Sequence, residues 1–466
     1  MSTDLSAATA ADLRPAPDAA VRALTQAVAR VHLPDTPRYR ELTVTSNVVK
    51  AVRPLVVVEV VDADDVSRVL RIAAACGVPV AVAGTGHGAT ESMAGAILIH
   101  TAALDELTVH PEGRWARVGA GVRWAAVLAA CAPHGLAGLC GSSTDVGVVG
   151  FLTGGGVGPM VRSHGLSSDS VRAFDVVTGD GVLRRATATE NPDLFWGLRG
   201  GKGSLGVVTA VEIDLADQAE VYAGSIWFDG ADATAVVRTW SVWSDLLPTE
   251  GTTSLAVMRL PDMDEFPEPL RGRTTIALRF TWTGDPAVGE EMIRAMRAVA
   301  TPLIDSVAVM PYAALGAVHA DPEDPMPLHE TSLLLDDFGP DTADVLVELV
   351  GPAAQTAQAM VEVRQLGGRL RTGPDCAFAH REAAYQVFVL GLMIPEIAQV
   401  VAADARRITD ALAPWARTGG LPNFTDTAGV AWAQRVYPPQ VAARLRELSR
   451  AYDPAGVLLA ARGVRG

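Results

Sequence analysis

The sequence predicts an α+β protein whose chain changes character near residue 216. Before that point, short runs of apolar residues alternate with a helical pattern and with glycine-dense loops. After it, longer segments alternate between apolar and polar residues, and loops rich in proline and aspartate separate them. A length of 466 residues suggests two to four domains. The change near residue 216 therefore predicts the start of a second domain.

The first region begins with a strand, a helix and a second strand, after a helical pattern at residues 19–31. Residues 56–61 are a buried apolar run. Acidic residues at 62–65 favour a helix start, because carboxylates suit the positive end of the helix dipole. Gly77 ends this helix, and residues 78–83 form the next buried strand. Further strands are predicted at residues 96–100, 171–178 and 207–215, an alternating segment at residues 114–119, and a helix at residues 124–131.

The second region has strand patterns at residues 252–260 and 273–281. Helical patterns recur between and after these strands. They lie at residues 287–300, 341–350, 394–412 and 439–452. The last of them ends at Asp453-Pro454, because proline cannot continue a helix. No internal repeat is found.

Composition excludes several classes of protein. A hydrophobic fraction of 49% excludes a disordered chain. A net charge of −15 argues against a nucleic-acid partner, because phosphate binding needs an excess of basic residues. Only Lys50 and Lys202 are lysines, so 36 of the 38 basic residues are arginine, which favours a bacterial, GC-rich source.

A cytoplasmic location is expected. The N-terminal residues 1–20 contain acidic side chains and lack the apolar stretch of a secretion signal. Residues 72–90 and 124–144 are uncharged at pH 7 but are interrupted by proline and glycine, so no membrane span is predicted. The chain has 4 cysteines without a paired framework, which suits a reducing compartment.

A glycine-rich loop follows the second buried strand as Gly84, Thr85, Gly86, His87 and Gly88. Glycines at such a loop let backbone N–H groups approach a phosphate. The alternative is an ordinary tight turn. The spacing departs from a dinucleotide fingerprint, and no helix pattern follows before the next strand. A P-loop, GxSxG and HExxH are all absent, and no metal site is expected.

A second glycine-dense block, residues 141–169, is more specific. It contains a cluster of side-chain hydrogen-bonding groups and a triple glycine. These residues are Ser142, Ser143, Thr144 and Asp145, followed by Gly154, Gly155 and Gly156. A flexible surface loop is the alternative, but the block is apolar between its glycines. That pattern favours a flat, extended cofactor lying along the backbone, and residues 191–215 repeat it.

Taken together, these segments resemble the flavin-binding domain of the vanillyl-alcohol oxidase / p-cresol methylhydroxylase superfamily. They are most similar to the bacterial berberine-bridge-enzyme-like FAD-linked oxidases. The segments are PVAVAGTGHG at 79–88, the blocks 141–169 and 191–211, LPNFTD at 421–426 and RLRELSRAYDPAGVL at 444–458. The resemblance implies an α+β, two-domain p-cresol methylhydroxylase-type FAD-binding fold. Residues 1–216 and 415–466 would form the FAD-binding domain, and residues 217–414 an antiparallel-sheet substrate domain.

The resemblance also implies how the cofactor would be held. His87 matches the histidine that many relatives link covalently to the flavin 8α-methyl group. A cysteine that provides a second link in some relatives is Ser143 here, so attachment through His87 alone is expected. The implied FAD-binding residues are Gly84, Thr85, Gly86, His87, Gly88, Ser142, Ser143, Asp145, Val146, Gly150, Gly154, Gly155, Gly156, Gly206, Val207, Val208 and Asn423.

The catalytic base is left open by the resemblance. Tyrosines of many relatives are replaced here by Val157, Leu421 and Phe424, none of which takes up a proton. His380 and Tyr385 are the candidates retained for the substrate domain.

Other polar side chains of the substrate domain are further candidates for the same site. They are Arg381, Tyr312, His319, His329, Arg259 and Arg279. For each histidine the alternative is a surface position or a hydrogen-bonded structural role, and for each arginine of a strand a solvated outer face. His164 is interpreted as structural.

The implied function is that of an FAD-dependent oxidase. It would transfer a hydride from a small organic substrate, such as a secondary metabolite, to flavin N5, with O₂ as acceptor and H₂O₂ as product. Two alternatives stay open: a redox-neutral flavoprotein such as a cyclase or dehydratase, and a flavin-binding protein without catalysis. The expected partners are the substrate and O₂, without nucleic acid or membrane, in a monomer or homodimer.

Overall fold

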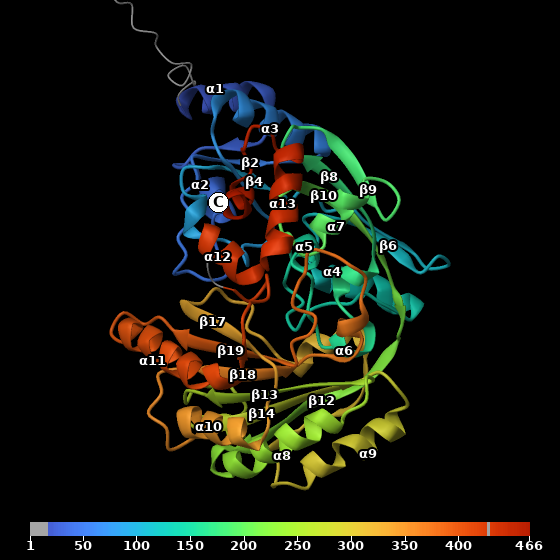
Figure 1. The fold of residues 1–466 in the computed structure, drawn as a ribbon, viewed down its shortest axis with the longest axis vertical. Coiled ribbons are helices and arrows are strands. Elements are labelled where there is room, and N and C mark those ends of the chain that lie inside the picture. The colour runs from blue at the N-terminus through green and yellow to red at the C-terminus, as the bar shows by residue number, and fades with distance from the viewer. Residues whose placement is uncertain (1–16, 426–428) are drawn as a thin grey trace, which may run out of the picture.

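The computed structural model describes residues 17–425 and 429–466, which form two lobes (Figure 1). The upper lobe combines the N-terminal part of the chain, in blue to green, with the C-terminal helices, in red. The lower lobe comes from the middle of the chain, in green to orange. Residues 1–16, which carry most of the expectation of no secretion signal, lie outside the described residues, as does Asp426 of the LPNFTD segment.

The first sheet of the upper lobe has the order β1-β2-β4-β3, and β4 runs parallel to β2 and β3. Its strands are β1 (Val31–His32), β2 (Val56–Glu59), β3 (Val80–Ala83) and β4 (Ile97–His100), with helices α1 (Pro17–Ala27), α2 (Pro37–Leu42) and α3 (Ala63–Cys76). The Asp62 carboxylate caps α3 by accepting a hydrogen bond from the Asp65 amide, and Gly77 ends the helix with a φ of 68°. The predicted strand, helix and strand are confirmed.

The second sheet of the upper lobe is antiparallel, with the order β5-β6-β10-β8-β9. Its strands are β5 (Leu107–His110), β6 (Trp115–Gly119), β8 (Val171–Thr178), β9 (Leu183–Thr187) and β10 (Gly206–Asp214), and β7 (Leu136–Ala137) pairs separately with β11 (Ala216–Asp217). The helices of this part are α4 (Trp124–Cys131), α5 (Val148–Thr153), α6 (Val161–His164) and α7 (Pro192–Leu198). The glycine-dense block is not all loop, because Val148, Phe151 and Leu152 bury one side of α5 in the core.

The lower lobe contains one sheet of nine antiparallel strands, in the order β15-β12-β14-β13-β18-β19-β17-β20, with β16 beside β12. The strands are β12 (Glu220–Asp229), β13 (Gly251–Arg259), β14 (Thr274–Trp282), β15 (Ile304–Asp305), β16 (Ala308–Pro311), β17 (Leu328–Leu335), β18 (Met360–Gln365), β19 (Tyr385–Leu392) and β20 (Ala416–Arg417). The helices are α8 (Ala233–Leu246), α9 (Pro286–Arg297), α10 (Pro340–Val350) and α11 (Ala398–Ala411), which cover the outer face of the sheet (Figure 1).

Side chains of this sheet alternate between two environments. Val361 and Val363 of β18 pack into the core under the helices. Because successive side chains of a strand point to opposite faces, Glu362 and Arg364 lie on the inner face, which is turned toward the upper lobe (Figure 1). The inner face is therefore where a polar site between the lobes can form.

The C-terminal segment returns to the upper lobe as α12 (Gly429–Val436), α13 (Pro439–Tyr452) and α14 (Leu459–Arg465). The amide of Val80 in β3 donates to the Val457 carbonyl at 2.8 Å. The buried Asp453 carboxylate accepts hydrogen bonds from the amides of Val457 and Leu458. β20 still pairs with β17 of the lower sheet, just after the predicted boundary near residue 415, and the two predicted boundaries stay predictions.

Among residues 17–425 and 429–466, no helix is both long and apolar enough to cross a membrane. The same residues contain no group of three or more His, Cys, Asp or Glu side chains placed to hold a metal ion. All four cysteines are buried and free.

Arg162 of α6, in the upper lobe, forms hydrogen bonds with the lower lobe. Its buried guanidinium group reaches into the lower lobe and donates to the carbonyl oxygens of Gly251 at 2.7 Å and of Leu366 and Leu247 at 2.8 Å. Leu247 is the residue that ends α8, whose last carbonyl groups lack helical partners. One arginine thus supplies donors to carbonyl groups from several parts of the lower lobe.

We expect Arg162→Ala to lower the free energy of unfolding by roughly 3 kcal/mol, because several buried carbonyl groups lose their donor. Urea denaturation followed by tryptophan fluorescence measures this. Arg22→Ala, on the exposed side of α1, is the matched control and should change the stability by less than about 0.5 kcal/mol. Equal effects of the two substitutions would contradict the role assigned to Arg162.

Candidate functional site

The predicted phosphate loop directly follows β3. Within the described residues, the backbone amides of residues 85–88 have no hydrogen-bond acceptor. Gly86 has a φ of 84°, and a Cβ atom there would lie 2.8 Å from the Val44 carbonyl oxygen, so only glycine fits. A Cβ atom on Gly88 would meet nothing within 4 Å. Free amides beside open space form a nest of donors that suits an anionic group.

Gly150 of α5 also faces open space, with nothing within 4 Å of a Cβ atom placed on it. The other glycines expected to bind the cofactor are closely packed by the protein itself. They are Gly84 against Thr101, Gly154 against Asn423, Gly155 against Phe378, Gly156 against Phe151, and Gly206 against Val176 and Val177. Packing within the chain is enough to require glycine at these positions, and their contact with a cofactor stays a prediction.

The two predicted cofactor loops meet at His87. Its Nε2 atom lies 3.4 Å from Oδ2 of Asp145 in the second glycine-dense block. Arg123 pairs with the same Asp145 oxygen at 2.5 Å and donates to the Asp145 carbonyl at 2.6 Å. A Cβ atom on Gly147 would lie 3.2 Å from the Thr85 side chain, so the loops are in van der Waals contact. The structure therefore brings both loops to one place.

Lys202 is a site residue that the sequence interpretation missed. Its Nζ atom donates to the Gly150 carbonyl at 3.2 Å and contacts Oδ1 of Asn423, and the Asn423 amide donates to the Phe151 carbonyl at 2.9 Å. Burial lowers the pKa of the Lys202 amine to about 8. The available signal was its rarity, because it is one of two lysines among 38 basic residues.

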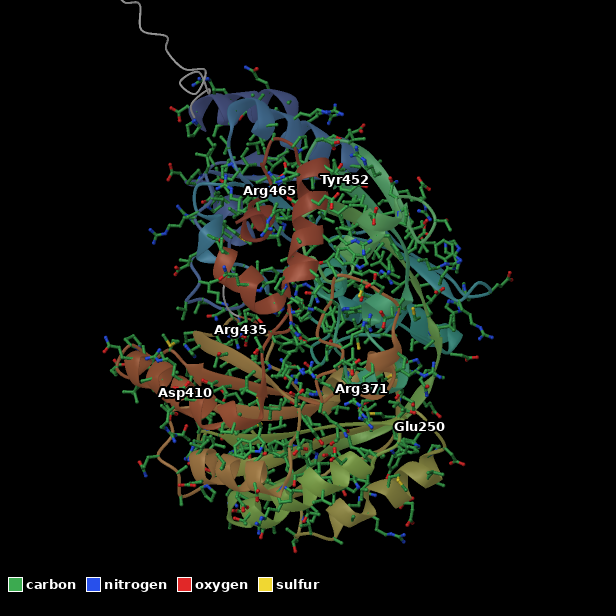
Figure 2. All side chains as sticks on the ribbon, in the orientation of Figure 1. Glu250, Arg371, Asp410, Arg435, Tyr452 and Arg465 are labelled. Carbon is green, nitrogen blue, oxygen red and sulfur yellow. The ribbon has the colours of Figure 1, made fainter. Side chains whose placement is uncertain are left out.

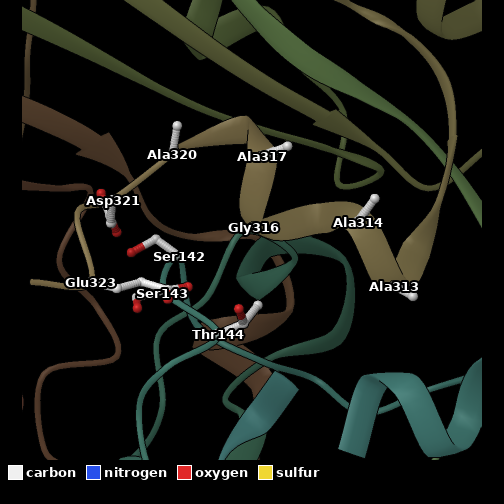
Figure 3. Close-up of a pocket in the computed structure, with 10 residues that line it drawn as sticks. All are labelled: Ser142, Ser143, Thr144, Ala313, Ala314, Gly316, Ala317, Ala320, Asp321 and Glu323. Carbon is white, nitrogen blue, oxygen red and sulfur yellow. The ribbon is translucent and has the colours of Figure 1, made fainter. Parts of the chain in front are cut away.

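A first cavity of about 310 Å³ lies between the second glycine-dense block and the lower lobe. Figure 3 shows Ser142, Ser143 and Thr144 on one wall and the short 3₁₀ helix Tyr312–Val318 on the other. Asp321 and Glu323 add negative charge at its edge. Two predicted cofactor-binding residues, Ser142 and Ser143, therefore line an open space rather than the packed core.

Gly206, Val207 and Val208, the other predicted flavin-side residues, lie in β10, and Val207 pairs with Val177 of β8. All three are buried. Val146 is half-buried against the core of the upper lobe. Because their side chains are buried in the protein, these residues are better suited to contact a ligand through their backbone than through their side chains.

A second, narrow cavity of about 30 Å³ lies on the inner face of the lower sheet. Its walls combine strand residues with the loop after the triple glycine, and they are Val157, Gly158, Pro159, Val161, Thr252, Thr253, Ser254, Arg279, Thr281, His319, Arg364, Gln365 and Leu366. Buried polar atoms without a hydrogen-bond partner gather here: Thr252 Oγ1, Arg279 Nε, His319 Nδ1 and Gln365 Oε1. Buried polar groups are nearly always hydrogen-bonded, so these unpaired atoms indicate that the cavity binds a polar group.

Glu362 organises this inner face. Its fully buried carboxylate accepts hydrogen bonds at 2.7 Å from Arg279 Nη1, Arg364 Nε and Ser254 Oγ. Nε2 of His319 lies 3.5 Å away. The two guanidinium groups hold the pKa of the Glu362 carboxyl well below its usual range, against the effect of burial. The cluster combines one carboxylate with two guanidinium groups, so one positive charge is in excess.

The three positions at which the family resemblance implies tyrosine come together as an apolar wall. Val157 and Leu421 are buried in one cluster, and Phe424 packs against it. The Phe424 ring contacts the Phe388 ring edge-on at 5.7 Å, and the Arg364 guanidinium lies 5.0 Å from its centre. This wall stands beside the charged cluster and offers no group that accepts a proton.

Residues 421–425 also join the lobes. The Ser332 hydroxyl of β17 donates to the Phe424 carbonyl at 2.7 Å. Arg435 of α12 contacts the Ser332 carbonyl, and Figure 2 shows Arg435 where the C-terminal helices approach the lower sheet. Through Asn423 and Lys202, the same segment contacts the second glycine-dense block.

His380 and Tyr385, the retained base candidates, have structural partners. Nε2 of His380 lies 2.8 Å from the Val436 carbonyl oxygen. The Tyr385 hydroxyl is buried under the outer helices, 3.0 Å from Ser244 Oγ and 2.8 Å from Asp245 Oδ1. Neither residue lines the two cavities described here. Their assignment as bases stays a prediction without support from the geometry.

The remaining candidates divide clearly. Arg381 pairs with Asp169, Tyr312 donates to the Gly138 carbonyl, and Arg259 donates to the Gly351 and Ala354 carbonyls. His329 lies on β17, on the same face of the strand as Leu333 and Leu335 of the core under the helices, and His164 is half-buried in α6. Only His319 and Arg279 of this set line the narrow cavity.

Comparison with known proteins agrees with this geometry. Residues 54–187 match a family model described as an FAD binding domain. An FAD-dependent monooxygenase of Cochliobolus heterostrophus is 33% identical over 211 residues, covering 44% of this chain and 41% of that protein. (R)-6-hydroxynicotine oxidase of Paenarthrobacter nicotinovorans is 26% identical over 431 residues, covering 86% and 89%. The chain thus spans about two fifths of the fungal relative, and relatives occur in both fungi and bacteria.

Two solved structures show the same fold over nearly the whole chain. 6-Hydroxy-D-nicotine oxidase from Arthrobacter nicotinovorans has a TM-score of 0.78 at 23% identity, covering 93% of this chain and 98% of that one. BBE-like 1 of Physcomitrella patens has a TM-score of 0.81 at 18% identity, covering 96% and 98%. The predicted α+β, p-cresol methylhydroxylase-type fold is confirmed. The chain therefore combines a match to an FAD binding domain over residues 54–187 with the fold of these two proteins over nearly its whole length.

We expect the Lys202 amine to titrate near pH 8, because burial disfavours its charged form. The chain has two lysines, so a protein labelled with ¹³C at the lysine ε-carbon gives two signals in NMR, and Lys202→Arg assigns them. Lys50→Arg is the control, which should leave the low-pKa signal in place. Titration of both signals in the ordinary lysine range, near pH 10.4, would contradict the enclosed position of Nζ.

Proposed function

We propose that this chain is an FAD-dependent oxidase that acts on a small organic molecule. The observation that carries the proposal is the nest of free amides at residues 85–88, beside the open backbone of Gly88 and Gly150. A dianionic pyrophosphate fits such a nest. The FAD binding domain match over residues 54–187 and the full-length relative, a hydroxynicotine oxidase, support it.

The residues that would hold FAD lie in the two glycine-rich loops and β10, with Asn423 from the C-terminal segment. When bound, FAD would supply the acceptor for a hydride from the substrate, and O₂ is the proposed final oxidant. Lys202 and Asn423 hold the C-terminal segment against the second glycine-dense block, and this contact would form one border of the FAD site.

The substrate would lie between these loops and the inner face of the lower sheet. Val157, Leu421 and Phe424 exclude water from one side of this space because they form an apolar wall. Arg279 and Arg364 leave one excess positive charge on the other side, which favours substrates that carry or develop negative charge. Such a site both orients a small molecule and shields it from solvent.

A redox-neutral flavoprotein, such as a cyclase or dehydratase, is the second candidate. Replacement of the relatives' tyrosines by Val157 and Phe424 favours it, because a familiar proton acceptor is missing from the wall. Turnover that continues with the flavin kept reduced would support this alternative. Strict dependence on O₂ or another electron acceptor would reject it.

The setting of the protein is also proposed. The predominance of arginine over lysine favours a bacterial source, and the free, buried cysteines suit a reducing cytoplasm. A monomer or homodimer is proposed, acting without nucleic acid or membrane.

We expect the purified protein to carry bound flavin whose visible absorbance is bleached by dithionite and by the true substrate. Screening of small hydroxylated and amine metabolites under nitrogen, followed by exposure to air, measures reduction and reoxidation with H₂O₂ release. Protein without flavin, or flavin that dithionite leaves oxidised, would refute the oxidase proposal.

We also propose that the flavin is linked covalently to His87 and to no other residue. The imidazole lies at the meeting point of both loops, and Ser143 replaces the cysteine of a second link. Flavin fluorescence on an acid-denatured gel should stay with the wild-type band and disappear in His87→Ala. His110→Ala, in β5 of the same lobe, is the control and should keep the fluorescence. A dark wild-type band would reject the link.

A further inference from the structure

We propose that His319 is the proton acceptor for a hydroxyl group of the substrate, that Glu362 positions His319, and that Arg279 binds the oxyanion formed. This inference rests on the proposed function and names the chemistry of the same site. It also identifies the substrate class as alcohols or phenols whose reacting end is a hydroxyl group. His319, Arg279 and Thr252 line the narrow cavity, and Glu362 lies next to His319 and pairs with Arg279.

The tautomer of His319 follows from its neighbour. Nε2 lies 3.5 Å from Oε1 of Glu362, and an ionised carboxylate only accepts hydrogen bonds. This neighbour favours the tautomer with the ring proton on Nε2, on the side of Glu362, which leaves the lone pair on Nδ1. A carboxylate that orients an imidazole in this way is a known device for preparing a general base. Glu362 is itself unsuited as the base, because its oxygens already accept from Arg279, Arg364 and Ser254.

His319 lines the cavity, and its Nδ1 atom has no hydrogen-bond partner. Nδ1 is buried and unpaired, as is Nε of Arg279, and both residues line the same narrow space. One atom needs a donor and the other needs an acceptor. A hydroxyl group provides both at a single oxygen, and Thr252 Oγ1 offers a third unpaired contact. The cavity of about 30 Å³ admits one such small group, while the rest of the substrate lies outside it.

The electrostatics keep His319 in the unprotonated form that a base needs. Burial lowers the pKa of His319, and Arg279 of β14 and Arg364 of β18 lower it further, while Glu362 of β18 raises it. His319 is therefore neutral near pH 7 and available as an acceptor. In the transfer the substrate O–H bond breaks and an N–H bond forms at Nδ1, giving an imidazolium and an oxyanion. The net charge of the site does not change, since both charges form within it.

The other residues considered as proton acceptors are less suited to this role than His319. The wall formed by Val157, Leu421 and Phe424 has no proton acceptor. His380 and Tyr385 are engaged elsewhere. The alternative occupant of the cavity is an ordered water molecule, which would pair the same atoms without any chemistry. The experiment below separates these two occupants.

The test uses 4-nitrophenol, a phenol whose ionised form absorbs visible light, and the flavin-loaded protein. Binding is measured by difference absorbance and by calorimetry in two buffers that differ in ionisation enthalpy, below the pKa of the free phenol. In wild type we expect the bound phenol to ionise without proton release to the buffer, because His319 retains the proton. In His319→Gln, ionisation should be lost or should release a proton. His110→Gln, outside the site, should behave as wild type.

Several outcomes would overturn the inference. They are a wild-type protein that does not ionise or bind the phenol, one that releases the proton to the buffer, and a His319→Gln variant that matches wild type. A cavity that holds only water gives the first of these. Flavin content and dithionite reduction are measured on the same samples, so failure of the oxidase proposal is recognised separately from failure at His319.

Kinetics with any substrate that reduces the flavin give a second readout. We expect His319→Gln to lower kcat/KM by about 10²–10⁴-fold. The base must be neutral, so wild-type kcat/KM should fall as pH drops through the His319 pKa, which lies below its usual value of about 6.5. That acid limb should disappear in His319→Gln. An unchanged pH profile would assign His319 a structural role only.

Discussion

The buried charge of Glu362 is the constraint on which the inner face of the lower sheet depends. A carboxylate removed from water is tolerated only when it is paired and hydrogen-bonded. Arg279, Arg364 and Ser254 provide these partners from three adjacent strands, so their positions are set by strand register as much as by chemistry. His319 Nε2 lies 3.5 Å from Oε1, the same carboxylate oxygen that accepts from Arg279 and Ser254. The cluster that stabilises the buried Glu362 carboxylate therefore also contains the imidazole of His319.

The lobes are joined by interactions of the same kind. Arg162 supplies donors to buried carbonyl groups of the lower lobe, and Asn423 fills the space that a side chain at Gly154 would occupy. Lys202 extends this contact to α5, the helix within the second glycine-dense block. Because polar groups cross the junction in directed pairs, the lobes meet in one defined orientation. The narrow cavity depends on that orientation, since its walls come from both sides.

The glycines acquire two distinct explanations. Gly88 and Gly150 lie beside open space, which is the arrangement a bound cofactor requires. The triple glycine is different, because protein side chains occupy the volume where its Cβ atoms would be. Glycine content alone does not separate these cases. A glycine-rich segment, which costs conformational entropy on folding, can be required by a bound ligand or by close packing within the protein. Only the tertiary structure shows which of the two lies against each glycine.

The sequence by itself determined the α+β class, the strand, helix and strand at the start of the upper lobe, and the two loops at which an FAD site was expected. These are local consequences of hydrophobic period, helix caps and glycine spacing, which act over a few residues. The sequence did not indicate that Lys202 belongs to the site or that α5 is a helix. It also gave no reason to prefer His319 to His380 and Tyr385 as the base. Those depend on which side chains meet across hundreds of residues, and burial and pairing of polar atoms are properties of the tertiary structure alone.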